Sequence, residues 1–395
     1  MINNEMYKLG SKRSVIRELF EFGKARALEV GADNVYDYSL GNPNVPAPDC
    51  VKQAILDILD EKDNTAVHGY TSAQGDAPVR QAIANNIQRR FGTTVSKDNI
   101  YMTCGASASL CITLKALCNQ GDEVILFAPF FPEYPVFVNA SNAVPVIVPY
   151  GSDNFKIDFD AFEKAITPKT KAVLFNSPNN PSGVVYGEDA IIQLTNILKA
   201  KCHQFGTTIY LIADEPYREL VYDDVFVPYV MNYYANSIIC YSYSKSLSLP
   251  GERIGYIAVA PSTEDASDVY AAICGAGRAL GYVCAPSLFQ KVIEKCVDAM
   301  PNIDEYRRNR DVLYNALTDI GYECVRPNGA FYLFVKSLED NAFEFSKKAM
   351  SLDLMIVPGD AFHAKGYVRL AYCVSNQTIV NSIPAFKKLY EMYQN

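Results

Sequence analysis

Short apolar runs alternate with helix-like stretches through the middle of the chain. Between about residues 75 and 260, segments with apolar residues at helical spacing separate runs rich in β-branched and aromatic residues. These runs are apolar throughout, which is typical of strands covered on both faces. They read, in order, IYMTC, EVILFA, VPVIVPY, AVLFN, IYLIA, IICYS and GYIAVA. Strands that alternate with helices predict an α/β fold, in which helices cover a mostly parallel, mixed sheet.

The pattern changes in the last quarter of the chain. A long helical pattern covers about residues 286–318, and a strand pair, a helix, two short strands and a terminal helix follow it. This texture predicts a smaller α+β domain, and we expect a helix over residues 12–31 to pack with it. The predicted division is an N-terminal segment that joins the small domain, a large ligand-binding domain and a small C-terminal domain, at residues 1–48, 49–285 and 286–395.

Charge and composition narrow the class of function. The net charge of −8 argues against nucleic acid or an anionic membrane as a partner, because both attract basic surfaces. The 11 cysteines show no C-x-x-C spacing, which favours reduced thiols in a cytoplasmic protein. The three histidines do not pair at metal-ligand spacing, so we expect no metal site. No apolar run is long enough to predict a membrane-spanning helix.

Lys245 lies in the segment SYSKSLSLPGERIGY, directly after an apolar run. A lysine among small hydroxyl residues at the end of a strand is well placed to form a Schiff base, if burial or a nearby cation lowers its pKa. Arg253, in the same segment, could supply that positive charge and could also bind a phosphate. The alternative is a solvated loop lysine, since most lysines are exposed.

Residues that could contact a ligand follow three other predicted strands. Asp214 ends the run in IYLIADEPY, Asn180 belongs to the turn FNSPNNPSG, and Gly105 opens a helix in TCGASASL. Ligands bind beyond the carboxyl ends of strands in open α/β sheets, and the N-terminus of a helix binds phosphate well. A helix N-cap remains the alternative for Asp214, and an ordinary turn is the alternative for the asparagine segment.

Arg369 lies inside the apolar run YVRLAY of the predicted small domain. Arginine is seldom buried without an anionic partner. A carboxylate ligand bound through two parallel hydrogen bonds would account for this position. An internal salt bridge would account for it equally well.

Together, these segments resemble the class I/II aminotransferases, the aspartate-aminotransferase-like enzymes of fold type one that depend on pyridoxal 5′-phosphate (PLP). The resemblance covers nearly the whole chain. The matching motifs occur in the order of the family: LGNP, HGYTSAQG, NSPNNPSG, ADEPY, SYSKSLSLPGERIGY and YVRL. It implies a PLP-dependent transaminase that moves an amino group from an amino acid to a 2-oxo acid.

The resemblance also implies roles around the pyridine ring. Lys245 would form the internal aldimine with PLP and would later shuttle a proton at the substrate. Asp214 would pair with the protonated ring nitrogen. Tyr217 and Asn180 would hydrogen-bond the 3′-oxygen, and Phe131 would stack on the ring.

Further implied roles concern the phosphate and the substrate. Arg369 would bind the substrate α-carboxylate, and Gly41 would belong to a loop that closes over it. Tyr70 would reach the phosphate of the neighbouring subunit, so the resemblance implies a homodimer. The implied phosphate-binding residues within one chain are Gly105, Ala106, Ser107, Ser242 and Arg253.

The substrate and the reaction keep alternatives. An aspartate and 2-oxoglutarate pairing would need a second cation, but Ser107 stands where one bacterial subgroup carries a lysine. Arg278 is a weak candidate for that cation, and a surface salt bridge is its alternative. A PLP-dependent C–S lyase resembling cystathionine β-lyase would bind the cofactor with the same residues. A ligand-sensing regulator is disfavoured, because no helix-turn-helix pattern precedes the fold.

Overall fold

The computed structural model describes residues 2–11, 14–61, 63–151 and 154–394. Residues 12 and 13, where the predicted N-terminal helix was expected to begin, lie outside the described residues. Helix α2 covers Val15–Val30, and the side chain of Ser14 caps it by accepting a hydrogen bond from the Arg17 backbone N–H. No helix in the described ranges combines the length and apolar character needed to cross a membrane.

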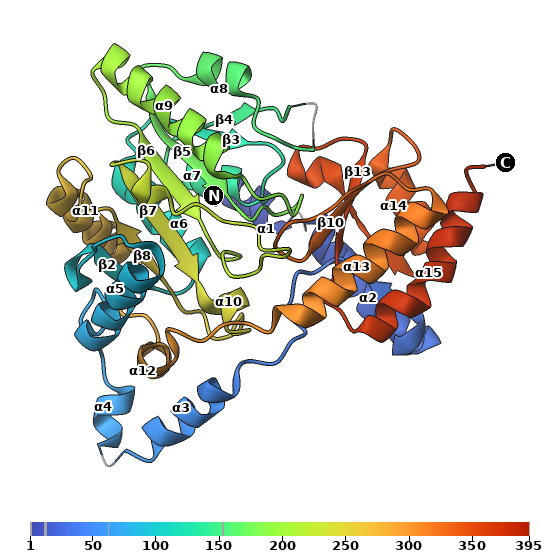
Figure 1. Cartoon of the computed structure of the whole chain (residues 1–395), viewed down its shortest axis with the longest axis horizontal. Coiled ribbons are helices and arrows are strands. Elements are labelled where there is room, and N and C mark those ends of the chain that lie inside the picture. The colour runs from blue at the N-terminus through green and yellow to red at the C-terminus, as the bar shows by residue number, and fades with distance from the viewer. Residues whose placement is uncertain (1, 12–13, 62, 152–153, 395) are drawn as a thin grey trace.

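A seven-stranded mixed sheet lies at the centre of the larger domain (Figure 1). Its strand order is β2-β8-β7-β6-β5-β3-β4, and only β8 runs antiparallel to its neighbours. The strands are β2 (Ile100–Thr103), β3 (Glu123–Phe127), β4 (Val144–Val148), β5 (Thr170–Asn176), β6 (Tyr210–Asp214), β7 (Ser237–Ser242) and β8 (Gly255–Val259). All seven apolar runs therefore form strands, and the α/β prediction is confirmed.

Helices cover both faces of this sheet. The helices of this part of the chain are α3 (Asp49–Leu59), α4 (Asn64–His68), α5 (Ala77–Phe91), α6 (Ala106–Leu117), α7 (Tyr134–Ala140), α8 (Phe159–Ala165), α9 (Glu188–Phe205), α10 (Tyr243–Ser246), α11 (Ala266–Ala279) and α12 (Ser287–Cys296). Four 3₁₀ helices are η1 (Ala32–Asn34), η2 (Lys97–Asn99), η3 (Val230–Asn232) and η4 (Gly359–Phe362).

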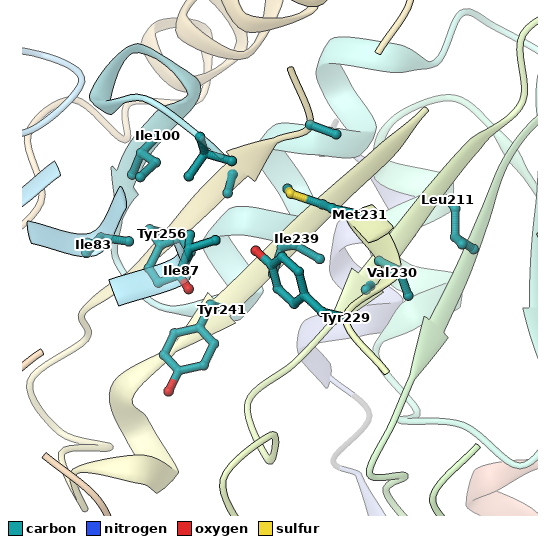
Figure 2. Close-up of a cluster of buried hydrophobic side chains, with 14 of the residues drawn as sticks. Ile83, Ile87, Ile100, Leu211, Tyr229, Val230, Met231, Ile239, Tyr241 and Tyr256 are labelled. Atoms are coloured by element: carbon teal, nitrogen blue, oxygen red, sulfur yellow. The ribbon is translucent and has the colours of Figure 1, made fainter. Parts of the chain in front are cut away.

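Alternate side chains of each strand enter two different cores, because successive residues point to opposite faces. In β6, Leu211 packs in one core with α5, α9 and α12, and Ile212 packs in the other with α6, α7 and α11. Figure 2 shows part of the first core, including Ile83 and Ile87 from α5. Burial on both faces explains why the strands have no polar alternation in the sequence.

Local signals set the ends of α5. Pro78 lies in its first turn, where a missing N–H costs nothing. Gly92 ends the helix in the left-handed conformation, with φ of 70°, and its N–H donates to the carbonyl of Gln88. Glycine adopts this conformation without the penalty that a Cβ would bring.

The small domain has its own antiparallel sheet, with the order β12-β13-β10-β9. Its strands are β9 (Cys324–Val325), β10 (Tyr332–Lys336), β12 (Val357–Pro358) and β13 (Tyr367–Ala371). Its helices are α13 (Ile303–Ile320), α14 (Ala342–Met350) and α15 (Asn376–Glu391). From the N-terminal segment, β1 (Tyr36–Asp37) pairs in parallel with β11 (Leu354–Met355), whereas α1 (Asn4–Ser11) buries no side chain.

The prediction of one helical stretch over residues 286–318 is wrong, because the chain forms α12 and α13 with a break between them. Pro301 lies in the break, and proline cannot continue a helix from the preceding turn. Helix α12 packs against α3 and α5 rather than against the small sheet. These contacts favour a domain boundary after α12, between Cys296 and Ile303; the division of the chain stays a proposal.

A buried ion pair fixes the segment that follows β6. Glu215 and Arg218 are 3% and 5% exposed, and the guanidinium donates to both carboxylate oxygens. Arg218 also donates to the backbone carbonyls of residues 227–228 and lies 5.1 Å from the rings of Phe91 and Tyr229. The chain directly after Asp214 is thereby held by polar and aromatic contacts on several sides.

Replacing Arg218 by Met should lower the free energy of unfolding by about 3–5 kcal/mol, because it leaves the buried Glu215 carboxylate without its partner. Denaturant unfolding would measure the change. Arg89→Met is the matched control, since Arg89 pairs with Asp298 at 2.6 Å but both side chains are more than half exposed. That variant should lose less than about 1 kcal/mol. Equal losses would contradict the importance of burial.

Candidate active site

A cavity of about 260 Å³ lies where the carboxyl ends of the large sheet meet the small domain. Its lining brings together residues that are far apart in the sequence, from Ile16 to Arg369. The predicted site residues that line it are Gly41, Ala106, Ser107, Phe131, Asn180, Asp214, Tyr217, Ser242, Lys245, Arg253 and Arg369. Sequence positions more than 300 residues apart therefore share one pocket.

Lys245 lies on α10, the short helix that follows β7, and its side chain reaches into the cavity. Its Nζ donates to the carbonyl oxygen of Gly41 at 2.6 Å and lies 5.4 Å from the centre of the Phe331 ring. Burial is the main cause that lowers the pKa of Lys245 to about 8; the positive charges of Arg253 and Arg369 contribute to this shift, and Cys373 opposes it. A substantial fraction of the amine is therefore neutral near pH 8.

Asp214 ends β6 and presents one unsatisfied oxygen. Its Oδ2 accepts a hydrogen bond of 2.6 Å from the Tyr134 hydroxyl, while Oδ1 has no partner among the described residues. Burial raises the pKa of Asp214 to about 7, and the hydrogen bond from Tyr134 opposes that rise. A buried acceptor without a partner lowers the stability of the folded protein. This oxygen is therefore available to accept a hydrogen bond from a ligand.

The N-terminus of α6 faces Arg253 across a narrow gap. Gly105 precedes the helix with φ of 88°, and a Cβ at this position would lie 2.9 Å from Nη2 of Arg253. No side chain caps the helix, so its first backbone N–H groups are available to an anion. The hydroxyls of Ser242 and Ser244 lie 2.7 Å apart beside them. Gly105 itself does not line the cavity, but it leaves the space that Arg253 occupies.

Arg369 lies on β13 and is 2% exposed. Its Nη1 donates to Oδ1 of Asn180 at 3.0 Å, its Nη2 donates to the carbonyl of Ser39, and its Nε has no partner among the described residues. Burial lowers the pKa of Arg369. Arg369 takes part in none of the ion pairs found in the described ranges, so its geometry favours a carboxylate ligand over the internal salt bridge.

Two candidates lie away from the pocket of their own chain. Tyr70 is 100% exposed between α4 and α5, and Arg278 is exposed near the end of α11. Neither belongs to the cavity lining.

The sequence did not indicate several side chains that matter to the geometry. Tyr134 binds Asp214, and the hydroxyl of Tyr332 lies 2.8 Å from that of Tyr217. Ile16, from α2, also lines the cavity. Apolar helical spacing predicted that α2 packs, but gave no sign of which residue would face a ligand.

Comparisons with known proteins agree with this architecture. The family model for aminotransferase class I and II matches residues 33–385. The crystal structure of an aminotransferase from Eubacterium rectale is 54% identical, covers 100% of both chains and has a TM-score of 0.98. The aspartate aminotransferase of Thermus thermophilus, solved with maleate, is 26% identical over 96% of this chain and 97% of its own, with a TM-score of 0.84.

A curated relative leads to the same family. The probable aspartate/prephenate aminotransferase of Thermus aquaticus is 32% identical, and the match covers 92% of this chain and 94% of that protein. The chain belongs to the class I and II aminotransferases and is a PLP-dependent transaminase.

Proposed function

We propose that this enzyme moves an amino group from an amino acid to a 2-oxo acid, with Lys245 as the residue that holds PLP covalently. One observation carries the proposal: the Lys245 amine, with a pKa of about 8, shares a cavity with the unsatisfied oxygen of Asp214. An amine that is neutral near the working pH can bond to an aldehyde carbon, and the Asp214 carboxylate can accept a hydrogen bond from a protonated ring nitrogen and stabilise its charge.

The groups that line the cavity fit the functional groups of PLP. Asp214 would accept a hydrogen bond from the ring nitrogen, and Tyr217 and Asn180 would bind the 3′-oxygen. Phe131 would stack on the ring. The phosphate would be bound by Gly105, Ala106, Ser107, Ser242 and Arg253. When bound, PLP withdraws electrons from the substrate α-carbon and stabilises the negative charge that develops there.

The chain's own residues would supply proton transfer and orientation. The Nζ of Lys245 would take a proton from the substrate α-carbon and would then donate a proton to a neighbouring atom. A pKa of about 8 allows the amine to do both. Arg369 would bind the α-carboxylate, replacing the neutral partners that it has here with a charged one. Gly41, whose carbonyl accepts from Lys245, would lie beside that carboxylate.

The finer assignment is an aspartate and 2-oxoglutarate pairing. The names of the relatives support it, as does the Thermus thermophilus enzyme solved with maleate, a dicarboxylate. Lys245, Arg253 and Arg369 are the cations of the described lining, and all three have proposed roles. Arg278 would therefore bind the distal carboxylate in the pocket of a neighbouring subunit. The same relatives are aminotransferases and give no support to a C–S lyase.

A homodimer follows from the same reasoning. The fully exposed Tyr70 would reach the phosphate in the neighbouring subunit, which would explain why a large aromatic ring is left open to solvent in its own chain. Each active site would then be incomplete in a monomer. The cytoplasmic location expected from the cysteines stays a prediction, although all 11 cysteines are free in the structure.

Lys245→Ala should abolish transamination while the thermal unfolding temperature stays near that of the wild type. The substitution removes the amine that would bind PLP and carry the proton. Single-turnover absorbance with an amino acid in excess would measure the conversion of PLP to pyridoxamine phosphate. Lys245→Arg is the matched variant, because it keeps the charge without a readily neutral amine, and it should also be inactive. Full activity in Lys245→Ala would refute the assignment.

The amine of Lys245 should become reactive about two pH units below an ordinary lysine, whose pKa is about 10.4. Below pH 8 most of the Lys245 amine is the unreactive ammonium form. The rate at which trace acetic anhydride acetylates Lys245 in the cofactor-free protein should therefore rise as the pH passes through 8. Peptide mass spectrometry would measure it. Lys336 is the internal control, since its hydrogen bond to Glu323 raises its pKa. Parallel curves for the two lysines would contradict the depressed value.

Arg278→Ala should reduce kcat/KM for aspartate by about tenfold or more, because a lost charged hydrogen bond costs about 1.5–3 kcal/mol. Activity with alanine, which lacks the distal carboxylate, should change little. Arg89→Ala, another exposed arginine, controls for loss of surface charge. Equal losses for the two donors would remove Arg278 from substrate recognition.

A further inference from the structure

The Tyr332 hydroxyl lies between the residues assigned to the cofactor and those assigned to the substrate. We propose that Tyr332 is a positioning residue that acts on bound PLP through Tyr217, by donating its proton to the Tyr217 oxygen. This inference rests on the role proposed above for Tyr217.

The two hydroxyls form one buried pair. Their oxygens lie 2.8 Å apart, and the rings meet nearly edge to face, with centroids 5.7 Å apart and an angle of 82°. Each hydroxyl has one proton to donate. If Tyr217 gives its proton to the 3′-oxygen of PLP, the hydrogen bond between the pair requires Tyr332 to be the donor.

Burial and nearby charge act on both hydroxyls of the pair. Burial raises both pKa values, that of Tyr217 well above the ordinary range and that of Tyr332 to about 12. The positive charge of Arg369 lowers both pKa values, and its guanidinium lies 4.6 Å from the centre of the Tyr332 ring. Asp214 raises the pKa of Tyr217, and Cys373 raises that of Tyr332. The hydrogen bond between the two hydroxyls itself raises the pKa of Tyr217 and lowers that of Tyr332. The direction of donation is therefore inferred from the geometry of the pair and from the engagement of the Tyr217 proton by PLP.

Packing holds the Tyr332 hydroxyl in place. A Cβ on Gly41 would lie 2.1 Å from it, so the hydroxyl fills the space that glycine leaves. Gly41 is also the residue whose carbonyl accepts from Lys245. A proton donated to Tyr217 from this fixed position would polarise the Tyr217 hydroxyl and strengthen its own donation, because successive hydrogen bonds reinforce one another.

The test measures the pH at which the absorbance of bound PLP changes in the loaded enzyme, without any substrate. Donation from Tyr217 stabilises the negative 3′-oxygen and lowers that midpoint. Tyr332→Phe keeps the ring beneath Arg369 and removes only the hydroxyl. It should raise the midpoint by about 0.5–1 pH unit. Tyr322→Phe is the matched control, because Tyr322 is a buried small-domain tyrosine whose hydroxyl binds the Phe386 carbonyl outside the cavity. It should leave the midpoint unchanged.

The double variant decides whether Tyr332 acts through Tyr217. Tyr217→Phe should raise the midpoint, and adding Tyr332→Phe to it should cause no further shift. An unchanged midpoint in Tyr332→Phe, or an additional shift in the double variant, would overturn this inference alone. An unchanged midpoint in Tyr217→Phe would overturn the role of Tyr217 and this inference with it.

A second substitution at residue 332 covers a failure of the phenylalanine variant to fold. Replacement of Tyr332 by 3,5-difluorotyrosine keeps the hydroxyl and makes it more acidic. The stronger donor should lower the midpoint. A midpoint that stays the same, or rises, would overturn the proposal.

Discussion

Burial of the Lys245 amine is the constraint on which the rest of the site depends. An ammonium group removed from water loses solvation, and two arginines in the same cavity make the charged form still less favourable. The amine accordingly rests against the Gly41 carbonyl and the face of Phe331 rather than against a carboxylate. Every segment that encloses the cavity contributes to this desolvation, so the pKa of Lys245 depends on the whole fold around the cavity.

The same burial leaves polar atoms without partners. Oδ1 of Asp214 and Nε of Arg369 are buried and unsatisfied among the described residues, and both residues line one cavity. Such atoms reduce the stability of the folded chain, because water cannot compensate them. They persist since the framework around them is stable, including the Glu215–Arg218 pair directly after Asp214. A ligand that supplies a hydrogen-bond donor to Asp214 and an anion to Arg369 would relieve both costs.

Two parts of the chain must meet to form this arrangement. The large sheet provides Asp214 and Lys245 at the ends of β6 and β7, whereas β10 and β13 of the small sheet provide Tyr332 and Arg369. The N-terminal segment adds Gly41, and β1 ties that segment to the small domain by pairing with β11. Hydrogen bonds such as Arg369–Asn180 cross between these parts. The geometry of the site thus depends on the relative position of the two sheets.

The amino-acid sequence by itself determined the strands and the ends at which chemistry occurs. Continuous apolar runs identified β2 to β8, because strands buried on both faces need no polar positions, and Asp214 and Lys245 were placed by following such runs. Only the tertiary structure decided which side chains face one another: Tyr134 on Asp214, Tyr332 on Tyr217, and Asn180 in place of an acid on Arg369. It also separated α12 from α13 and left Tyr70 exposed. Periodicity records which face of an element is buried, whereas the partner of a polar atom depends on contacts between residues distant in sequence.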